Sequence, residues 1–372
     1  MSICSNTDPP DLLFSCFETA SRIRQKSVED FVRRNAILAT IGVLALAGAT
    51  LVAQTVQING GGATFPYPIY SKWFTEYNKL HPTVQINYQS QGSGFGIQQV
   101  TKRTVFFGAT DGPMTQDQML AAPGRILHFP TVLGAVVPVY NIPGISQELK
   151  FNGPLLADIF LGKITKWNDA AIKKLNPDVN LPGSDIVVVH RSDGSGTSYI
   201  WVDYLAKVSP EWKQRVGVAT SVNWPVGLGG KGNEGVAAQV TQVPGTIGYV
   251  ELIYALQNKI SYGAVQNMNG KFVKASVAAV TAAAASAAKQ MPPDFRVSIT
   301  NAPGDAVYPI SSFTWLLLYE NHPDKGKAKV MVDFLKWALA DGQTFAADLG
   351  YAPLPKEVVD MEMKALATVK VQ

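Results

Sequence analysis

The residues best suited to chemistry lie in four glycine-rich turns, each predicted to join a strand to a helix. The turns are GGGATFPYP at 60–68, QGSGFGIQQV at 91–100, GATDGPMT at 108–115 and RSDGSGTS at 191–198. The first N–H groups of a helix have no partner inside it and carry the positive end of its dipole, and glycine lets a ligand approach the backbone closely. Each junction therefore favours an anion.

Small hydroxyl side chains recur in these turns, and one arginine accompanies them. The hydroxyls are those of Thr64, Ser93, Ser195 and Thr197. If folding brings the turns together, these hydroxyls and the neighbouring N–H groups could surround a tetrahedral oxyanion, with Arg191 as the fixed charge that binds it in a bidentate way. In any one turn, serine or threonine is more simply the N-cap of the following helix, so the anion site depends on all four turns.

Two carboxylates bear on the identity of the anion. Asp111 would repel an anion unless the ligand brings a proton that the carboxylate can accept; phosphate near neutral pH has one and sulfate does not. The difference is worth roughly several kcal/mol, or about a hundredfold or more in affinity. The alternative role of Asp111 is an Asx turn before Gly112 and Pro113. Asp193 could hold the Arg191 guanidinium in place, or it could be a plain N-cap.

Short apolar runs alternate with helical patterns from Gln54 onward. VQIN, VQINYQ, VFFGAT, DIVVVH, GTIGYV and SSFTWLLLYE predict strands, and periodic apolar residues between them predict helices. The alternation predicts an α/β fold with mixed or parallel sheets. The alanine-rich stretch 275–289 predicts a helix of high propensity, which we expect at the periphery and ended by Pro292 and Pro293.

The first 53 residues have the order of an export signal. A polar segment ending in Arg33 and Arg34 precedes the uncharged run AILATIGVLALAGATLVA at 36–53. The small residues at 47–49 offer a cleavage site, and Ala53 is a second candidate. The 18 uncharged residues could instead remain as a membrane anchor, and both the Sec and the twin-arginine routes stay open. Both cysteines precede this run, so the mature chain would hold no disulfide and no thiolate metal site.

Composition and spacing argue against several other classes of protein. The length of 372 residues with 47% hydrophobic content suits two globular domains, and a net charge of +4 without long basic runs predicts no nucleic-acid partner. The four histidines are scattered, which predicts no metal site. GLGGKGN at 227–233 lacks the spacing of a phosphate loop and is interpreted as a surface loop. A hydrolase triad of Ser195, His190 and Asp193 lies within six residues, too close in sequence to align base and nucleophile.

Nine segments occur together in a characteristic order. They are GGGATFPYPIYSKW, GSGFGIQQV, FGATDGPM, FPTVLGAVVPVYNIPG, FLGKITKWND, RSDGSGTSYIWVDYL, GLGGKGNEGVAAQV, GTIGYVE and YAPLP, and they span nearly all of 57–355. In these segments the chain resembles the periplasmic phosphate-binding proteins of high-affinity phosphate ABC transporters. The resemblance implies a hinged, two-domain type II binding-protein fold with mixed sheets and a central ligand cleft.

The resemblance also implies domain boundaries, partners and location. After the signal at 1–53, the first α/β domain would comprise 54–139 and 307–372, and the second 140–306. The protein would be a periplasmic monomer without cofactor or enzymatic activity, and would deliver inorganic phosphate to the membrane subunits of an ABC permease.

Carried over by motif, the resemblance implies a set of phosphate ligands. They are Thr64, the N–H of Phe65, Ser93, Asp111, Arg191, Ser195, the N–H of Gly196, and Thr197. Asp193 would be the partner that orients Arg191. The chain departs from the family at Gly61, where alanine is common, and at His190, where a second arginine is frequent. Neither departure removes a ligand.

Overall fold

One long mixed sheet organises residues 55–372, which form a single compact unit. The computed structural model describes residue 33, residues 55–288 and residues 291–372. The export signal predicted at 1–53 lies outside the described residues, Arg33 excepted.

The strands alternate with helices as the apolar pattern predicts. The strands are β1 (Val56–Gly62), β2 (Val84–Ser90), β3 (Phe107–Thr110), β4 (Ile126–Asn141), β5 (Lys150–Phe151), β6 (Val187–Arg191), β7 (Leu228–Gly230), β8 (Thr246–Glu251), β9 (Ser261–Tyr262), β10 (Ala264–Gln266), β11 (Phe272–Val273) and β12 (Ser311–Tyr319). The helices are α2 (Tyr67–Leu80), α3 (Ser93–Thr101), α4 (Gln116–Ala121), α5 (Gly153–Phe160), α6 (Ala170–Leu175), α7 (Gly196–Val208), α8 (Pro210–Arg215), α9 (Gly232–Gln242), α10 (Leu252–Gln257), α11 (Val277–Ala288), α12 (Lys325–Leu339) and α13 (Lys356–Leu366). Two 3₁₀ turns, Asp341–Phe345 and Ala347–Leu349, follow α12.

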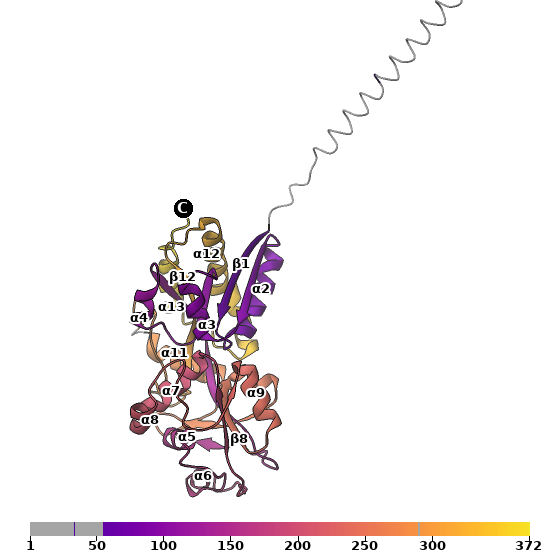
Figure 1. The fold of residues 1–372 in the computed structure, drawn as a ribbon, viewed down its shortest axis with the longest axis vertical. Coiled ribbons are helices and arrows are strands. Elements are labelled where there is room, and N and C mark those ends of the chain that lie inside the picture. The colour runs from indigo at the N-terminus through magenta and orange to yellow at the C-terminus, as the bar shows by residue number, and fades with distance from the viewer. Residues whose placement is uncertain (1–32, 34–54, 289–290) are drawn as a thin grey trace, which may run out of the picture. The chain divides into compact units, whose positions relative to one another are not determined.

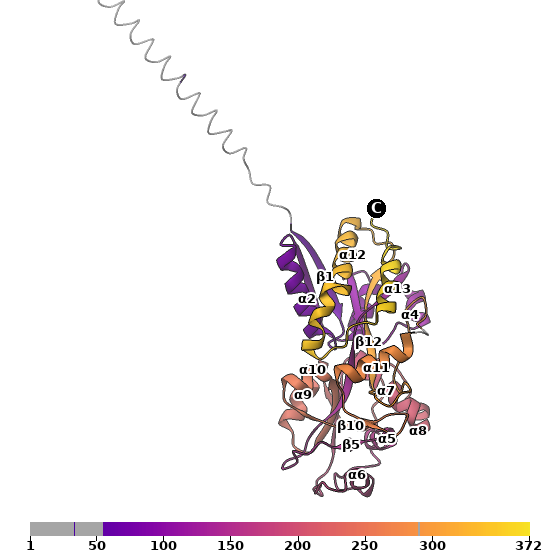
Figure 2. The same ribbon diagram turned by 180° about the vertical axis from the view of Figure 1, so that it is seen from behind.

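The strand β4 joins the two halves of the sheet. The strand order is β2-β1-β3-β12-β4-β8-β6-β7, with β9 also on β4, and a separate small sheet has the order β11-β10-β5. Residues 126–135 of β4 pair with β12, whereas residues 136–141 pair with β8, both in antiparallel register. In Figures 1 and 2, α2, α12 and α13 lie with β1 and β12 at one end, and α5, α6 and α8 lie at the other.

Parallel pairing fixes where the glycine-rich turns emerge. In the first half β1 pairs in parallel with β2 and β3, and in the second half β6 pairs in parallel with β7 and β8. The turns that follow these strands leave from their carboxyl ends, the edge of an α/β sheet where ligands bind. The central strands β8 and β12 are buried throughout, as expected for strands covered by helices on both faces.

The alanine-rich helix is not peripheral, so that prediction is wrong. In α11 the side chains of Ala279, Val280, Ala283 and Ala284 are buried, and the helix packs against β4 and β12. The three- and four-residue spacing of these positions forms a narrow apolar stripe. Because alanine is the best intrinsic helix former, its abundance revealed the helix but not the face that it buries.

Candidate functional site

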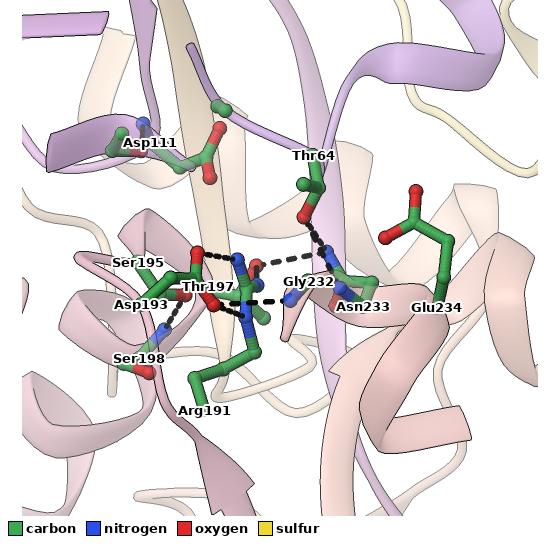
Figure 3. A network of polar contacts seen from close by, with 12 residues as sticks. Thr64, Asp111, Arg191, Asp193, Ser195, Thr197, Ser198, Gly232, Asn233 and Glu234 are labelled. Atoms are coloured by element: carbon green, nitrogen blue, oxygen red, sulfur yellow. Dashed lines mark hydrogen bonds and ion pairs between the residues drawn. The ribbon is translucent and has the colours of Figure 1, made fainter. Parts of the chain in front are cut away.

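The four glycine-rich turns meet between the two halves of the sheet (Figure 3). The predicted ligand side chains of Thr64, Asp111, Arg191, Ser195 and Thr197 are all buried there. Ser93 is buried as well, with its Oγ against the N–H of Asp111. The halves also touch directly through their backbones, because the N–H of Gly94 donates to the carbonyl of Gly194 at 2.8 Å. Residues separated by up to about a third of the chain therefore lie in one buried polar cluster.

Three tyrosines fix the direction of the first turn. Tyr88 donates to the carbonyl of Ala63 at 2.7 Å, Tyr254 to that of Thr64 at 2.6 Å, and Tyr351 to that of Phe65 at 2.6 Å. Burial raises the pKa of all three hydroxyls well above the ordinary value, so they stay protonated donors. The three carbonyl groups of this turn are thus occupied. The N–H of Phe65, in contrast, has no acceptor among the described residues and is left for a ligand.

Arg191 is held by Asp193 through two parallel hydrogen bonds. Its Nε lies 2.8 Å from Oδ1 and its Nη2 lies 2.5 Å from Oδ2, while Nη1 donates to Thr197 Oγ1 at 3.2 Å. Gly232 N–H donates to the same carboxylate at 3.0 Å. Burial alone would raise the pKa of Asp193, but the bonds from Arg191 outweigh it and hold that pKa below its ordinary value. A guanidinium has five N–H groups, so two remain for an anion.

Asp111 carries one carboxylate oxygen without a partner. Its Oδ1 accepts from Thr314 Oγ1 at 2.8 Å, whereas its buried Oδ2 has no hydrogen-bond partner in the part of the chain that is described. A Cβ built on Gly196 would lie 2.5 Å from Oδ2, so this oxygen lies against the beginning of α7. Burial raises the pKa of Asp111 to about 7, although the bond from Thr314 and the charge of Arg191 oppose the rise.

The unpartnered oxygen makes Asp111 a hydrogen-bond acceptor, whereas the other predicted ligand groups around it are donors. The proposed Asx turn is not formed by Asp111, because Thr110 Oγ1 accepts from the N–H of Gly112 at 3.2 Å and so organises that turn. A buried acceptor left unpaired costs about 1–3 kcal/mol, and a ligand that brings a hydrogen removes that cost.

Ser195 and Ser93 each accept one hydrogen bond and keep their own hydrogen. Ser195 Oγ accepts from the N–H of Ser198 at 3.0 Å, and Ser93 Oγ accepts from the N–H of Asp111 at 3.1 Å. The interpretation of Ser195 as an N-cap is therefore confirmed, whereas the plain N-cap role of Asp193 is wrong. Capping uses only a lone pair, so the Ser195 hydroxyl can also donate to a ligand. The N–H of Gly196 has no acceptor within the described ranges.

Sequence reasoning missed Asn233, which lies fully buried at the beginning of α9. The interpretation of 227–233 as a surface loop is wrong. Leu228 and Gly229 are exposed, but they belong to the strand β7. At the end of the stretch Gly232 contacts Asp193 and Asn233 contacts Thr64. The signal was present, because this stretch is a fifth glycine-rich passage from a strand into a helix.

The hydrolase triad does not form. His190 Nδ1 lies 3.0 Å from the carbonyl of Arg191, and its ring stacks on Trp224 with 4.8 Å between centroids. Asp193 is engaged by Arg191, so neither residue contacts Ser195 as a triad requires. Within the described residues no cluster of three or more histidine, cysteine, aspartate or glutamate side chains could hold a metal. No described helix has both the length and the apolar character for crossing a membrane.

Comparison with known proteins places the chain among binding proteins. A family model described as a PBP superfamily domain matches residues 48–341. The chain is 49% identical over 307 residues to a Phosphate-binding protein PstS of Xylella fastidiosa, covering 82% of this chain and 84% of that protein. It is 48% identical over 310 residues to a protein of the same name from Pasteurella multocida, covering 83% and 89% respectively.

A solved structure agrees with the fold. It is described as a high affinity periplasmic phosphate-binding protein (PfluDING) bound with phosphate, and it matches with a TM-score of 0.67 at 22% identity over 83% of this chain and 93% of that one. The predicted type II binding-protein fold with mixed sheets is thereby confirmed.

Proposed function

This chain belongs to the PBP superfamily and, within it, to the family of PstS phosphate-binding proteins; from that premise we propose that it captures inorganic phosphate and delivers it to an ABC-type import permease. The observation that carries this proposal is the unpartnered Oδ2 of Asp111 among groups that can only donate or still have a hydrogen to give. Such a site suits a tetrahedral oxyanion that has one protonated oxygen.

The proposed mechanism is selection by complementary hydrogen bonding. Donors to the anion are the N–H groups of Phe65 and Gly196, the hydroxyls of Thr64, Ser93, Ser195 and Thr197, and the two unused N–H groups of Arg191. Asp111 accepts from the proton of the ligand. Charge-assisted bonds contribute about 1.5–3 kcal/mol each, so a few of them, less the cost of closing the protein, reach about −8 kcal/mol and micromolar affinity. Each residue of this set acts as a binding group, and no bond of the ligand is broken.

Domain closure around the ligand accompanies this mechanism. The proposed domains are 54–139 with 307–372, and 140–306. The change of pairing partner within β4, between residues 135 and 136, supports a chain crossing close to the predicted boundary. The second crossing would lie at 306–310. Binding between the carboxyl edges of the two half-sheets would then pull the domains together.

We propose further that the protein is exported by its N-terminal segment and acts as a monomer in the periplasm, with no nucleic-acid partner. Sequencing the mature N-terminus distinguishes a cleaved signal, which would begin the protein at about residue 50 or 54, from a retained anchor. Arsenate, molybdate and a phosphonate are alternative oxyanions, and the partnerless oxygen of Asp111 favours those that can be protonated.

Calorimetric titration of the purified protein, stripped of bound anion, tests phosphate binding. We expect one phosphate per chain with micromolar or tighter affinity, and compaction in small-angle scattering from the same samples. Absence of heat at millimolar phosphate would contradict the function, and binding without compaction would contradict only the hinge.

A further inference from the structure

Asn233 contacts two of the proposed ligand hydroxyls at once. Its Nδ2 donates to Thr64 Oγ1 at 2.8 Å and to Thr197 Oγ1 at 3.1 Å, and its backbone N–H donates to Thr64 Oγ1 at 3.3 Å. Thr64 follows β1 in one half of the sheet and Thr197 lies on α7 in the other, so a single amide spans the meeting point of the turns (Figure 3).

The orientation of this amide is fixed by its other end. Asn233 Oδ1 accepts from the backbone N–H of Glu251 at 3.0 Å. A flipped amide would place an NH₂ group against that N–H and an oxygen against the threonines, so the bond to Glu251 makes the NH₂ face Thr64 and Thr197. Both of its hydrogens are then used, one on each threonine.

The lone pairs of the two threonine hydroxyls are consequently occupied. A hydroxyl has one hydrogen and two lone pairs. Thr64 Oγ1 receives two donors from Asn233, and Thr197 Oγ1 receives one from Asn233 and one from Arg191 Nη1. Each of the two hydroxyls can therefore form a further hydrogen bond only by donating its own hydrogen.

We propose that Asn233 is a positioning residue that sets the direction of both hydroxyls, so that Thr64 and Thr197 can act only as donors to the bound anion. The inference rests on the proposed phosphate function and deepens it. With both threonines restricted to donation, Asp111 Oδ2 is the only carboxylate acceptor of the proposed ligand set, beside one remaining lone pair each on Ser93 and Ser195. The site would therefore take an oxyanion with one protonated oxygen and disfavour neutral or fully protonated forms.

Asn233→Asp reverses this arrangement while keeping the size of the side chain. One carboxylate oxygen can still accept from Glu251, but the other faces the threonines and draws their hydrogens away from the ligand. Two donors to the anion are lost, so we expect phosphate affinity to fall by about a hundredfold or more. Asn152→Asp is the matched control, because Asn152 caps α5 by accepting from Leu155 N–H, which aspartate does equally well.

A double-mutant cycle separates hydroxyl direction from the added negative charge. In the wild type, Thr64→Val removes a donor to the anion, and we expect it to weaken phosphate binding by about tenfold or more. In Asn233→Asp, the Thr64 hydroxyl already donates to the aspartate, so the same change should cost less than about threefold. A charge effect alone, acting on the anion without passing through the Thr64 hydroxyl, would make the two substitutions additive.

Calorimetry of the full-length wild type, both single variants and the double variant, with phosphate taken into the millimolar range, completes the test. Loss of affinity in Asn233→Asp together with non-additivity supports the proposed role. Unchanged affinity in Asn233→Asp, or additive losses, would overturn it while leaving phosphate binding by the wild type intact. A wild type that does not bind phosphate would overturn the proposed function and this role with it.

Discussion

Replacing Arg191 with methionine is expected to weaken phosphate binding by about a thousandfold or more. The substitution removes the one cation of the site, with its two unused N–H groups, and it leaves the Asp193 carboxylate partly buried beside an anion with Gly232 N–H as its remaining donor. Each lost charge-assisted bond costs about 1.5–3 kcal/mol, and repulsion from the unpaired carboxylate adds to the loss.

Arg215→Met is the matched control for this substitution. Arg215 also pairs with a carboxylate, with Nη1 2.7 Å from Glu211 Oε1 on the same helix α8, but it is exposed and lies outside the site. We expect the control to bind phosphate as the wild type does. Arg191→Lys, which keeps the charge but not the planar fork, should fall between wild type and Arg191→Met. Calorimetry that finds Arg191→Met within tenfold of wild type would remove Arg191 from the ligand set.

Gly196→Ala is expected to reduce phosphate affinity by a comparable factor, about a thousandfold. A methyl group at this position would lie 2.6 Å from the Cβ of Asp111 and closer still to the Ser93 hydroxyl, well inside van der Waals contact. Gly196 belongs to one half of the sheet and both neighbours belong to the other, so alanine would hold the turns apart. The hydrogen bonds of Ser93, Gly196 and Asp111 to the ligand would weaken together.

Gly326→Ala controls for the change from glycine to alanine. Gly326 lies in α12, and the nearest atom to an added Cβ is Asp324 Oδ1 at 3.6 Å, an ordinary contact. This variant should bind phosphate normally and unfold at the same or a slightly higher temperature. Normal phosphate affinity in Gly196→Ala would show that the turns do not close on the ligand as proposed.

Local sequence patterns were sufficient to predict the strand and helix order and the glycine-rich turns. Each turn combines features within a few residues, such as the strand end, the glycines and the hydroxyl of RSDGSGTS, and such features can be read without a fold. The pairing of Arg191 with Asp193 is local in the same sense, and the two-residue spacing allowed it to be predicted.

The contacts that tune the site join distant parts of the chain and could not be predicted from these patterns. Thr314 donates to Asp111 across 203 residues, Tyr351 donates to the carbonyl of Phe65 across 286, and Asn233 reaches Thr64 across 169. Sequence alone indicated that Asp111 should accept from a ligand proton. That its Oδ1 is occupied and its Oδ2 is left unpaired depends on how β12 packs beside β3.

The buried face of α11 was missed for a related reason. An alanine-rich helix has little contrast between its faces, so its pattern does not reveal which side meets the sheet. Only the packing against β4 and β12 selects Ala279, Val280, Ala283 and Ala284 for burial.

One carboxylate acceptor among donors should select a protonated oxyanion, so phosphate and sulfate should compete very unequally for the site. The measurement is calorimetric titration of the purified, anion-free protein with sulfate at neutral pH, followed by phosphate in the same cell. We expect no sulfate heat at millimolar concentration and undiminished, one-to-one phosphate binding afterwards. Sulfate binding within about tenfold of phosphate would rule out this selection, because it would mean that Asp111 Oδ2 does not face the ligand.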